Sequence, residues 1–229
     1  PWNMQERFIL AAKEQEVNAN DLSNLVIGHN AYKLDIVRKY IDLHKSNNSL
    51  TEAKERELIR TSWLKGEHNF TELKTFMEYY KNYINEQDII AKSNQYLING
   101  NIKTANFLGY YIRDKDYKKY LKVITNFKKL SKSSISLLSS LPEEYQNDEA
   151  LIFYITKYYN AKNQDSKVSK YLLSLPSELE VPKRFKNAKI RNARYNIEKG
   201  NYKTAYQILQ NHQIRAGTAA YAEMEWLAG

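Results

Sequence analysis

Basic side chains gather on one predicted helix, which begins near Pro182 and ends near Lys199. At 100° per residue, four of them fall on one quadrant of the helix surface. Ammonium and guanidinium groups at this spacing suit ion pairing with an anionic polymer and supply no covalent chemistry. A run of charge is also typical of a solvated helix edge, so both interpretations stay open. The candidate substrate-binding residues are Lys183, Arg184, Arg191 and Arg194.

The same helix has two apolar sides, which predict how it packs. One side is formed by Phe185, Ala188 and Tyr195, and the other by Ile190, Ala193 and Ile197. A helix that is apolar on two sides is expected to lie between neighbouring helices. We therefore predict an inner helix whose basic edge is left open.

A second basic segment, residues 116–132, interleaves lysines with aromatic residues. Such a pattern can bind nucleic acid through phosphate pairing and base stacking. Here Tyr117, Tyr120 and Phe127 fall at helical spacing, which favours a packed helix with a lysine-rich outer face. No nucleic-acid partner is therefore predicted from this segment.

Metal and nucleophile chemistry has little support. The four histidines, at positions 29, 44, 68 and 212, form no i, i+4 pair and no His-Glu-x-x-His motif, and cysteine is absent. The seven glycines make neither a phosphate-binding loop nor a Gly-x-Ser-x-Gly elbow. We predict no metal and no cofactor.

Carboxylates are abundant, yet none is placed like a general acid, which needs a desolvated carboxyl in a cleft. We interpret them as helix-start or surface residues and predict no catalytic residue in this chain. Examples of these carboxylates are Glu143, Glu144, Glu178, Glu180, Glu223 and Glu225.

Composition agrees with a helical protein that has an anionic partner. Lysine and arginine exceed aspartate and glutamate by nine, and 42% of residues are hydrophobic. Only seven glycines and four prolines are present, which disfavours turn-rich β folds. No apolar stretch is long enough to span a bilayer, so no membrane span is predicted. Residues 1–7 do not form a signal peptide, although a signal could have been removed.

Two repeated segments indicate the elements that position these side chains. Residues 100–105, Gly-Asn-Ile-Lys-Thr-Ala, return at 200–205 as Gly-Asn-Tyr-Lys-Thr-Ala. Glycine can end one helix in the left-handed conformation, asparagine can cap the next, and alanine allows close packing. A second pair, 137–143 and 172–178, places Pro142 and Pro176 34 residues apart, which is the tetratricopeptide period.

These repeats and the helical spacing throughout the chain predict the fold. We expect an all-α, superhelical, tetratricopeptide-like array of antiparallel helix hairpins, with about thirteen helices. The expected organisation is one domain over residues 1–229. Its weakest internal boundaries are expected near 46–49 and 141–147.

The end of the chain resembles the α-superhelical domain of the soluble lytic murein transglycosylase family. Residues 219–229, Ala-Ala-Tyr-Ala-Glu-Met-Glu-Trp-Leu-Ala-Gly, are similar to the aromatic-Ala-Glu-x-Glu-Trp-Leu-Ala-Gly signature of that domain. Upstream, Ala193-Arg194 and Gly200-Asn201-Tyr202 through Tyr206 follow the family's order. The same order is kept by Leu141-Pro142, residues 151–154 and Leu175-Pro176. The part of the chain that carries these specific matches covers roughly residues 135–229.

Two departures from the family pattern are visible. This chain has Phe185-Lys186-Asn187 where the family often has an aromatic residue followed by Glu-Arg, which puts a family contact near Lys186 in doubt. It also has Gly-Asn at the turn where many members have Gly-Asp. The first half resembles the family only in its helical pattern and in the turn from Trp63 to Gly66.

The resemblance implies a periplasmic parent enzyme, a glycan lyase that cleaves peptidoglycan (murein) between N-acetylmuramic acid and N-acetylglucosamine. Its acid and base is one glutamate of a Glu-Ser motif in a separate, lysozyme-like C-terminal domain. This chain contains no Glu-Ser, so it is expected to be an inactive, non-catalytic part that positions glycan strands for that domain. The alternatives are a tetratricopeptide-like scaffold for protein–protein interaction and a basic repeat protein that binds RNA.

Overall fold

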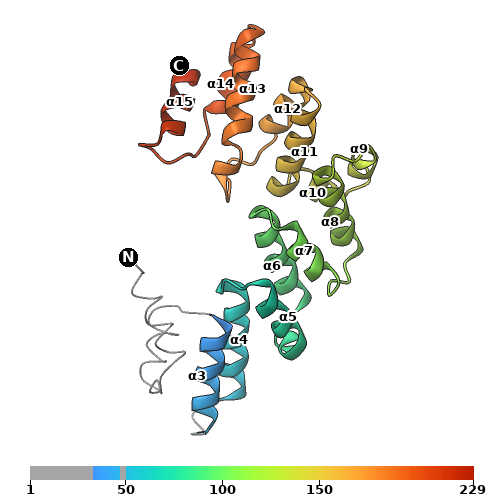
Figure 1. Ribbon diagram of the computed structural model, residues 1–229, viewed down its shortest axis with the longest axis vertical. Coiled ribbons are helices and arrows are strands. Elements are labelled where there is room, and N and C mark those ends of the chain that lie inside the picture. Colours follow the sequence, from blue (N-terminus) through green and yellow to red (C-terminus); the bar gives the residue numbers. More distant parts are fainter. Residues whose placement is uncertain (1–32, 47–49) are drawn as a thin grey trace. The chain divides into compact units, whose positions relative to one another are not determined.

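The computed structural model describes residues 33–46 and 50–229, drawn in colour in Figure 1. These residues hold thirteen α-helices, two short 3₁₀ helices and no β-strand. The predicted all-α class with about thirteen helices is therefore confirmed. The helical spacing in residues 1–32 concerns a part of the chain that lies outside the described residues.

The chain divides into two compact units, one up to Lys92 and one from Ser93 onward. The division falls within helix α6, and not at 46–49 or 141–147, where the sequence has its weakest internal boundaries. The single superhelical domain stays a prediction. Each unit is described by itself.

The first unit is built around Trp63, which is fully buried. Its indole N–H donates to the carbonyl of Asp88 over 2.8 Å, and its ring lies 4.8 Å from that of Phe76. Gly66 ends the helix of Trp63, as predicted. The elements are α3 (Leu34–Ser46), α4 (Glu52–Lys65), α5 (Phe70–Tyr79), η2 (Lys81–Tyr83) and the first part of α6 (Glu86–Ile98).

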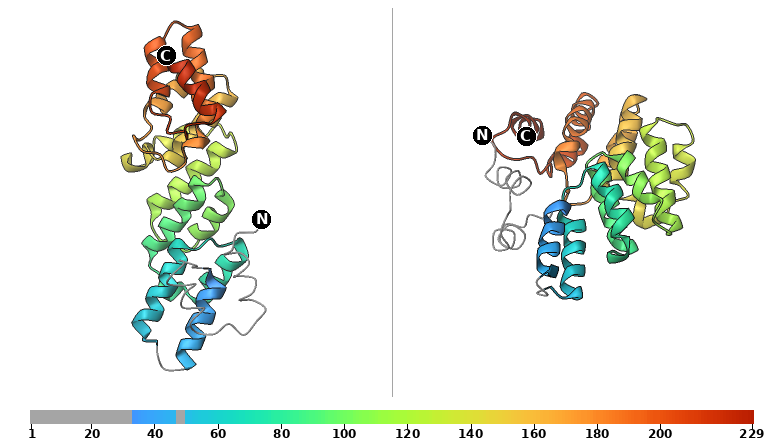
Figure 2. Two further views of the ribbon diagram at one scale, coloured as in Figure 1. Left: turned by 90° about the vertical axis from the view of Figure 1, so that its left-hand side faces the viewer. Right: turned by 60° about the horizontal axis from the view of Figure 1, so that its bottom comes forward.

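The second unit is a succession of helix hairpins. Figures 1 and 2 show its helices following one another in chain order, from green α7 to red α15. The elements are α7 (Ile102–Gly109), α8 (Lys115–Lys128), α9 (Ser134–Leu138), α10 (Glu143–Gln146), α11 (Glu149–Ala161), α12 (Asp165–Leu173), η3 (Pro182–Arg184), α13 (Lys186–Glu198), α14 (Tyr202–Leu209) and α15 (Ala219–Ala228).

One turn geometry recurs four times in this unit. Gly100, Leu130, Asn163 and Gly200 have φ of 84°, 56°, 53° and 74°. At each, the amide N–H bonds to the carbonyl three residues back, and the following N–H bonds to the carbonyl five residues back. This pair of bonds is the Schellman motif, which satisfies carbonyls that the ending helix leaves unpaired. The repeat predicted from two glycine turns therefore extends to four turns.

The predicted asparagine cap holds at one of the two glycine turns. The side chain of Asn101 accepts from the N–H of Thr104 over 3.2 Å. Asn201 makes no such bond, so the cap predicted there is wrong. The helix after Asn201 begins instead on a backbone bond alone, from the N–H of Ala205 to the Asn201 carbonyl at 3.1 Å.

Each proline of the second repeated pair follows the end of a helix. Helix α9 ends at Leu138 and α12 ends at Leu173, so each helix stops before its proline, Pro142 or Pro176. A short α10 follows Pro142.

Helix α13 packs as its apolar sides predict. Ile190 and Ala193 lie in a buried cluster with Ala205 and Leu209 of α14 and Met224 of α15. On the other side, Phe185, just before α13, is fully buried. The helix is thus fixed between neighbours, which sets the direction of its polar side chains.

The lysine-rich segment also packs as predicted. Tyr117, Tyr120 and Phe127 of α8 are 1%, 2% and 0% exposed, so their rings are unable to stack on bases. Lys118 and Lys122 lie on the exposed face of the helix. The aromatic residues of this segment serve the core.

Candidate functional site

A groove with a volume of about 510 Å³ runs along α13 in the second unit. Its floor is α13, and α12 and α15 each contribute a carboxylate to it. We call it the α13 groove. It is lined by Asp165, Lys186, Asn187, Ile190, Arg191, Arg194, Tyr195, Glu198 and Glu223.

Two of the predicted binding residues lie in this groove, but their charges are paired. The Nε atom of Arg191 lies 3.3 Å from Oδ1 of Asp165, and its Nη2 donates to Oδ1 of Asn163 over 3.2 Å. Arg194 donates to Oε1 of Glu223 over 2.7 Å. The basic edge is therefore open to solvent but not left unpaired at these positions, because α12 and α15 supply Asp165 and Glu223 as ion-pair partners.

Arg184 is directed away from the groove. Its guanidinium donates to the carbonyls of Leu97 and Ile98 at the end of α6, and lies 3.7 Å from the ring centre of Phe153. Burial lowers the pKa of Arg184 below its usual value. This arginine serves packing among hairpins, so the structure does not join it to Arg191 and Arg194.

Lys183 is exposed on the short η3 turn before α13. The four predicted residues therefore fall into two places, with Arg191 and Arg194 in the α13 groove and the other two outside its lining. Whether any of them binds a substrate stays a prediction.

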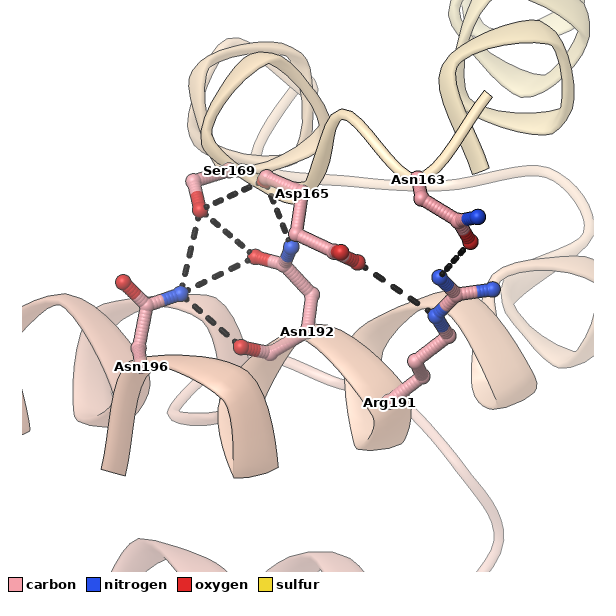
Figure 3. Close-up of polar contacts among 6 residues, drawn as sticks. All are labelled: Asn163, Asp165, Ser169, Arg191, Asn192 and Asn196. Atoms are coloured by element: carbon pink, nitrogen blue, oxygen red, sulfur yellow. Dashed lines mark hydrogen bonds and ion pairs between the residues drawn. The ribbon is translucent and has the colours of Figure 1, made fainter. Parts of the chain in front are cut away.

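Behind the groove, buried amides join α12 to α13 (Figure 3). Asn192 is fully buried and donates to the carbonyl of Asp165 over 2.8 Å. Ser169 donates to Oδ1 of Asn192 over 2.8 Å, and Asn196 donates to Oγ of Ser169 over 3.0 Å. The apolar pattern of the helices did not predict this network. Its signal was two asparagines four residues apart on the inner side of α13.

Asp165 is compensated inside the protein. Its Oδ1 is buried and makes no hydrogen bond of good geometry, but the Nε atom of Arg191 lies 3.3 Å from it. The ion pair therefore balances the charge of this carboxylate.

No family model, curated protein or solved structure matches this chain. The likeness to lytic transglycosylases in residues 135–229 therefore rests on the sequence motifs. In the structure, the signature residues of α15 have defined contacts. Met224 is buried, Glu223 pairs with Arg194, and Glu225 lies 2.9 Å from Nε2 of His212. Both signature glutamates thus fasten α15 to its neighbours.

The other carboxylates singled out in the sequence lie on the surface. Glu143, Glu144, Glu178 and Glu180 are exposed, as expected. Burial, followed by the charges of Glu149 and Asp148, raises the pKa of Glu180.

Glu149 was missed by the sequence analysis and is buried. It accepts the backbone N–H groups of Glu180 and Val181 at 2.7 and 3.0 Å. This carboxylate ties the loop before η3 to the start of α11, so its contacts are structural.

The described histidines have separate surroundings. His68 bonds the carbonyl of Ser62 over 2.8 Å, and burial lowers its pKa. The ring of His44 lies 4.3 Å from that of Tyr40. Across residues 33–46 and 50–229, no three His, Asp or Glu side chains converge as metal ligands. None of the helices described has the length and apolar character needed to cross a membrane.

Proposed function

We propose that this chain is a non-catalytic, superhelical part of a periplasmic peptidoglycan lytic transglycosylase. In this role it holds glycan strands for cleavage by a separate catalytic domain of the same parent chain. The observation that carries the proposal is the contribution of α15 to the α13 groove. The helix with the family-like signature places Glu223 against Arg194, inside the groove that also holds Arg191.

The chemistry of the groove suits a sugar polymer that bears carboxylates. Glycan hydroxyls are donors and acceptors, and the lining offers carboxylates, an amide and a tyrosine hydroxyl. Lys186 and the two arginines can attract the carboxylates of muramic acid peptides.

The contacts of the described acids support a non-catalytic role. General acid catalysis needs a carboxyl in a cleft with a raised pKa. Glu180, the one carboxyl whose pKa is clearly raised among the described residues, is exposed, and it does not line the α13 groove. Positioning a glycan strand requires binding and no acid–base chemistry. Surface side chains that form ion pairs, such as Arg191 and Arg194, can exchange those partners for a ligand.

Titration with a soluble glycan tests this proposal. A tetrasaccharide of alternating N-acetylglucosamine and N-acetylmuramic acid would be titrated calorimetrically into the full chain, Arg194→Ala and Arg191→Ala. Each arginine is about half exposed, so its loss should leave the fold intact. We expect each substitution to weaken binding about tenfold, the effect of a lost charge-assisted hydrogen bond.

Arg215→Ala is the matched control, because Arg215 is exposed and does not line the groove. Its affinity should equal that of the unaltered chain. Equal affinities for all four proteins would move the site away from the α13 groove. Absence of any binding to the tetrasaccharide would refute the proposal.

The scaffold alternative has one specific observation in its favour. Tyr202 and Tyr206 on α14 and Trp226 on α15 are 68%, 51% and 78% exposed. Exposed aromatic side chains are enriched where proteins bind one another. A tetratricopeptide-like scaffold would lose its protein partner on Trp226→Ala and keep its affinity for that partner in Arg194→Ala.

A further inference from the structure

Lys189 is a buried cation on the side of α13 away from the groove. Successive residues turn by 100°, so Lys189 and Arg191 lie roughly opposite each other on the helix. Lys189 is 4% exposed, whereas lysine is almost never fully buried without a partner. Its ammonium donates to the carbonyl of Asn211 over 2.9 Å.

No acid among the described residues balances this charge. Burial is the one cause that shifts the pKa of Lys189, lowering it to about 8, and no carboxylate raises it. Removing a charge from water is costly unless an opposite charge or several hydrogen bonds compensate. The Asn211 carbonyl supplies one acceptor for an ammonium that has three N–H donors.

A cavity of about 370 Å³ is lined in part by Lys189. Lys189 and Asn211 both line it, and Lys189 is the single charged residue in the lining. Its other polar lining residues are Ser177, Gln207 and Gln210, and Leu172 and Ile208 give it an apolar wall. The cavity therefore carries one positive charge, several neutral hydrogen-bonding groups and a small apolar surface.

The mouth of the cavity is held in place by side-chain bonds. Asn211 donates to the carbonyl of Ser177 over 2.6 Å, which ties the loop after α12 to the segment after α14. Gln213 accepts from the N–H of Leu179 over 2.9 Å. A site fixed on both sides in this way requires little ordering when a ligand enters.

We propose that this cavity binds the terminal carboxylate of a short peptide with small side chains, with the ammonium of Lys189 as the counter-ion. One ammonium balances one carboxylate, whereas a phosphate dianion would leave excess negative charge in the cavity. The amides of Gln207 and Gln210 can pair with peptide groups, and Leu172 and Ile208 can cover a methyl side chain. This inference does not depend on glycan binding in the α13 groove.

Two peptides that differ only at their end test the inference. Acetyl-alanyl-alanine with a free carboxylate and the same peptide as its carboxamide would be titrated into the full chain. We expect the free acid to bind about tenfold more tightly or better, because the amide lacks the charge that pairs with Lys189. Equal affinities, or no binding of the acid at millimolar concentration, would overturn the proposal.

A matched pair of variants locates the contact. Lys189→Met keeps an unbranched side chain that is one atom shorter and removes the charge, and it should reduce affinity for the acid about tenfold or more. Lys170→Met removes an exposed charge from α12 and should leave affinity unchanged. Full affinity in Lys189→Met, or tighter binding of inorganic phosphate than of the peptide acid, would contradict the assignment.

The unaltered chain gives a second readout that does not depend on the folding of a variant. Saturation with the peptide acid should raise the pKa of Lys189 from about 8 towards that of a free lysine, because the carboxylate stabilises the ammonium. The side-chain NMR signal of Lys189 followed over pH reports this change. A pKa that does not move at saturation would show that the carboxylate binds elsewhere.

Discussion

Oγ of Ser169 lies 2.8 Å from Oδ1 of Asn192, and this hydrogen bond crosses from α12 to α13 in the interior of the second unit. Both residues are buried, and Asn192 also donates to the Asp165 carbonyl. Asp165 in turn lines the α13 groove. The amide network is therefore the support on which the groove is built.

Asn192→Ala should destabilise the chain by about 1–3 kcal/mol, because it leaves the Asp165 carbonyl and the Ser169 hydroxyl with fewer buried partners. Urea unfolding measures the change. Asn187→Ala, at an exposed position of the same helix, is the control and should change stability by less than about 0.5 kcal/mol. Equal stabilities of the two variants would mean that the hydrogen bonds of this network do not form in solution.

Gly200→Val should cost about 1 kcal/mol or more, because a β-branched residue is disfavoured at a φ of 74°. A Cβ at this position would meet no atom within 4 Å, so the cost comes from the backbone alone. Gly200→Asn is the comparison, since asparagine already holds this conformation at Asn163. Thermal unfolding should rank Gly above Asn above Val. An unchanged melting temperature for Val would show that the turn has another geometry.

Leu130 occupies a turn position that suits glycine better. Its φ is 56°, and its side chain is 46% exposed, so little burial is lost on truncation. The left-handed conformation costs leucine about 1–2 kcal/mol, and glycine's extra chain entropy offsets about 0.5–1 kcal/mol of this. Leu130→Gly should thus raise stability by up to about 1 kcal/mol in urea unfolding. A clear loss of stability would mean that the Leu130 side chain contributes packing that outweighs the strain.

Much of the array could be predicted from sequence, and the reasons are local. The glycines at 100 and 200 are visible because glycine is the residue that favours positive φ. The equivalent turn at Leu130 was missed because leucine disfavours positive φ, and the turn at Asn163 because asparagine adopts this conformation less often than glycine. At Leu130, the backbone bonds of the Schellman motif outweigh the residue preference.

The candidate site was predicted only in part. Spacing on one helix placed Arg191 and Arg194 together, which the groove bears out. The same spacing could not show Asp165 or Glu223, which come from other helices and neutralise the edge. Spacing also could not show that Lys189 is buried. Buried lysines are rare, and in the sequence Lys189 stands among the other basic residues of the helix.

Stability should rise with pH between about 8 and 9.5. Burial lowers the pKa of Lys189 and of Lys92 to about 8, whereas an unfolded lysine titrates near ~10.4. In that window the unfolded chain binds more protons than the folded chain, so raising the pH favours folding. The raised pKa of buried Tyr117 and Tyr120 acts in the opposite direction at higher pH, which sets the upper limit.

Lys189→Met removes one of the two lysine contributions, so its stability should rise less over this range. Urea unfolding at several pH values gives both curves, and Lys170→Met serves as the exposed control. Parallel curves for Lys189→Met and the unaltered chain would show that Lys189 has an ordinary pKa in the folded state.

Co-sedimentation with purified murein sacculi tests the central claim, that this chain holds glycan without cutting it. The full chain should pellet with sacculi, Arg191→Ala/Arg194→Ala should pellet much less, and the supernatant should contain no anhydro-muropeptides. Equal pelleting of the double variant, or release of anhydro-muropeptides by the chain alone, would contradict the account.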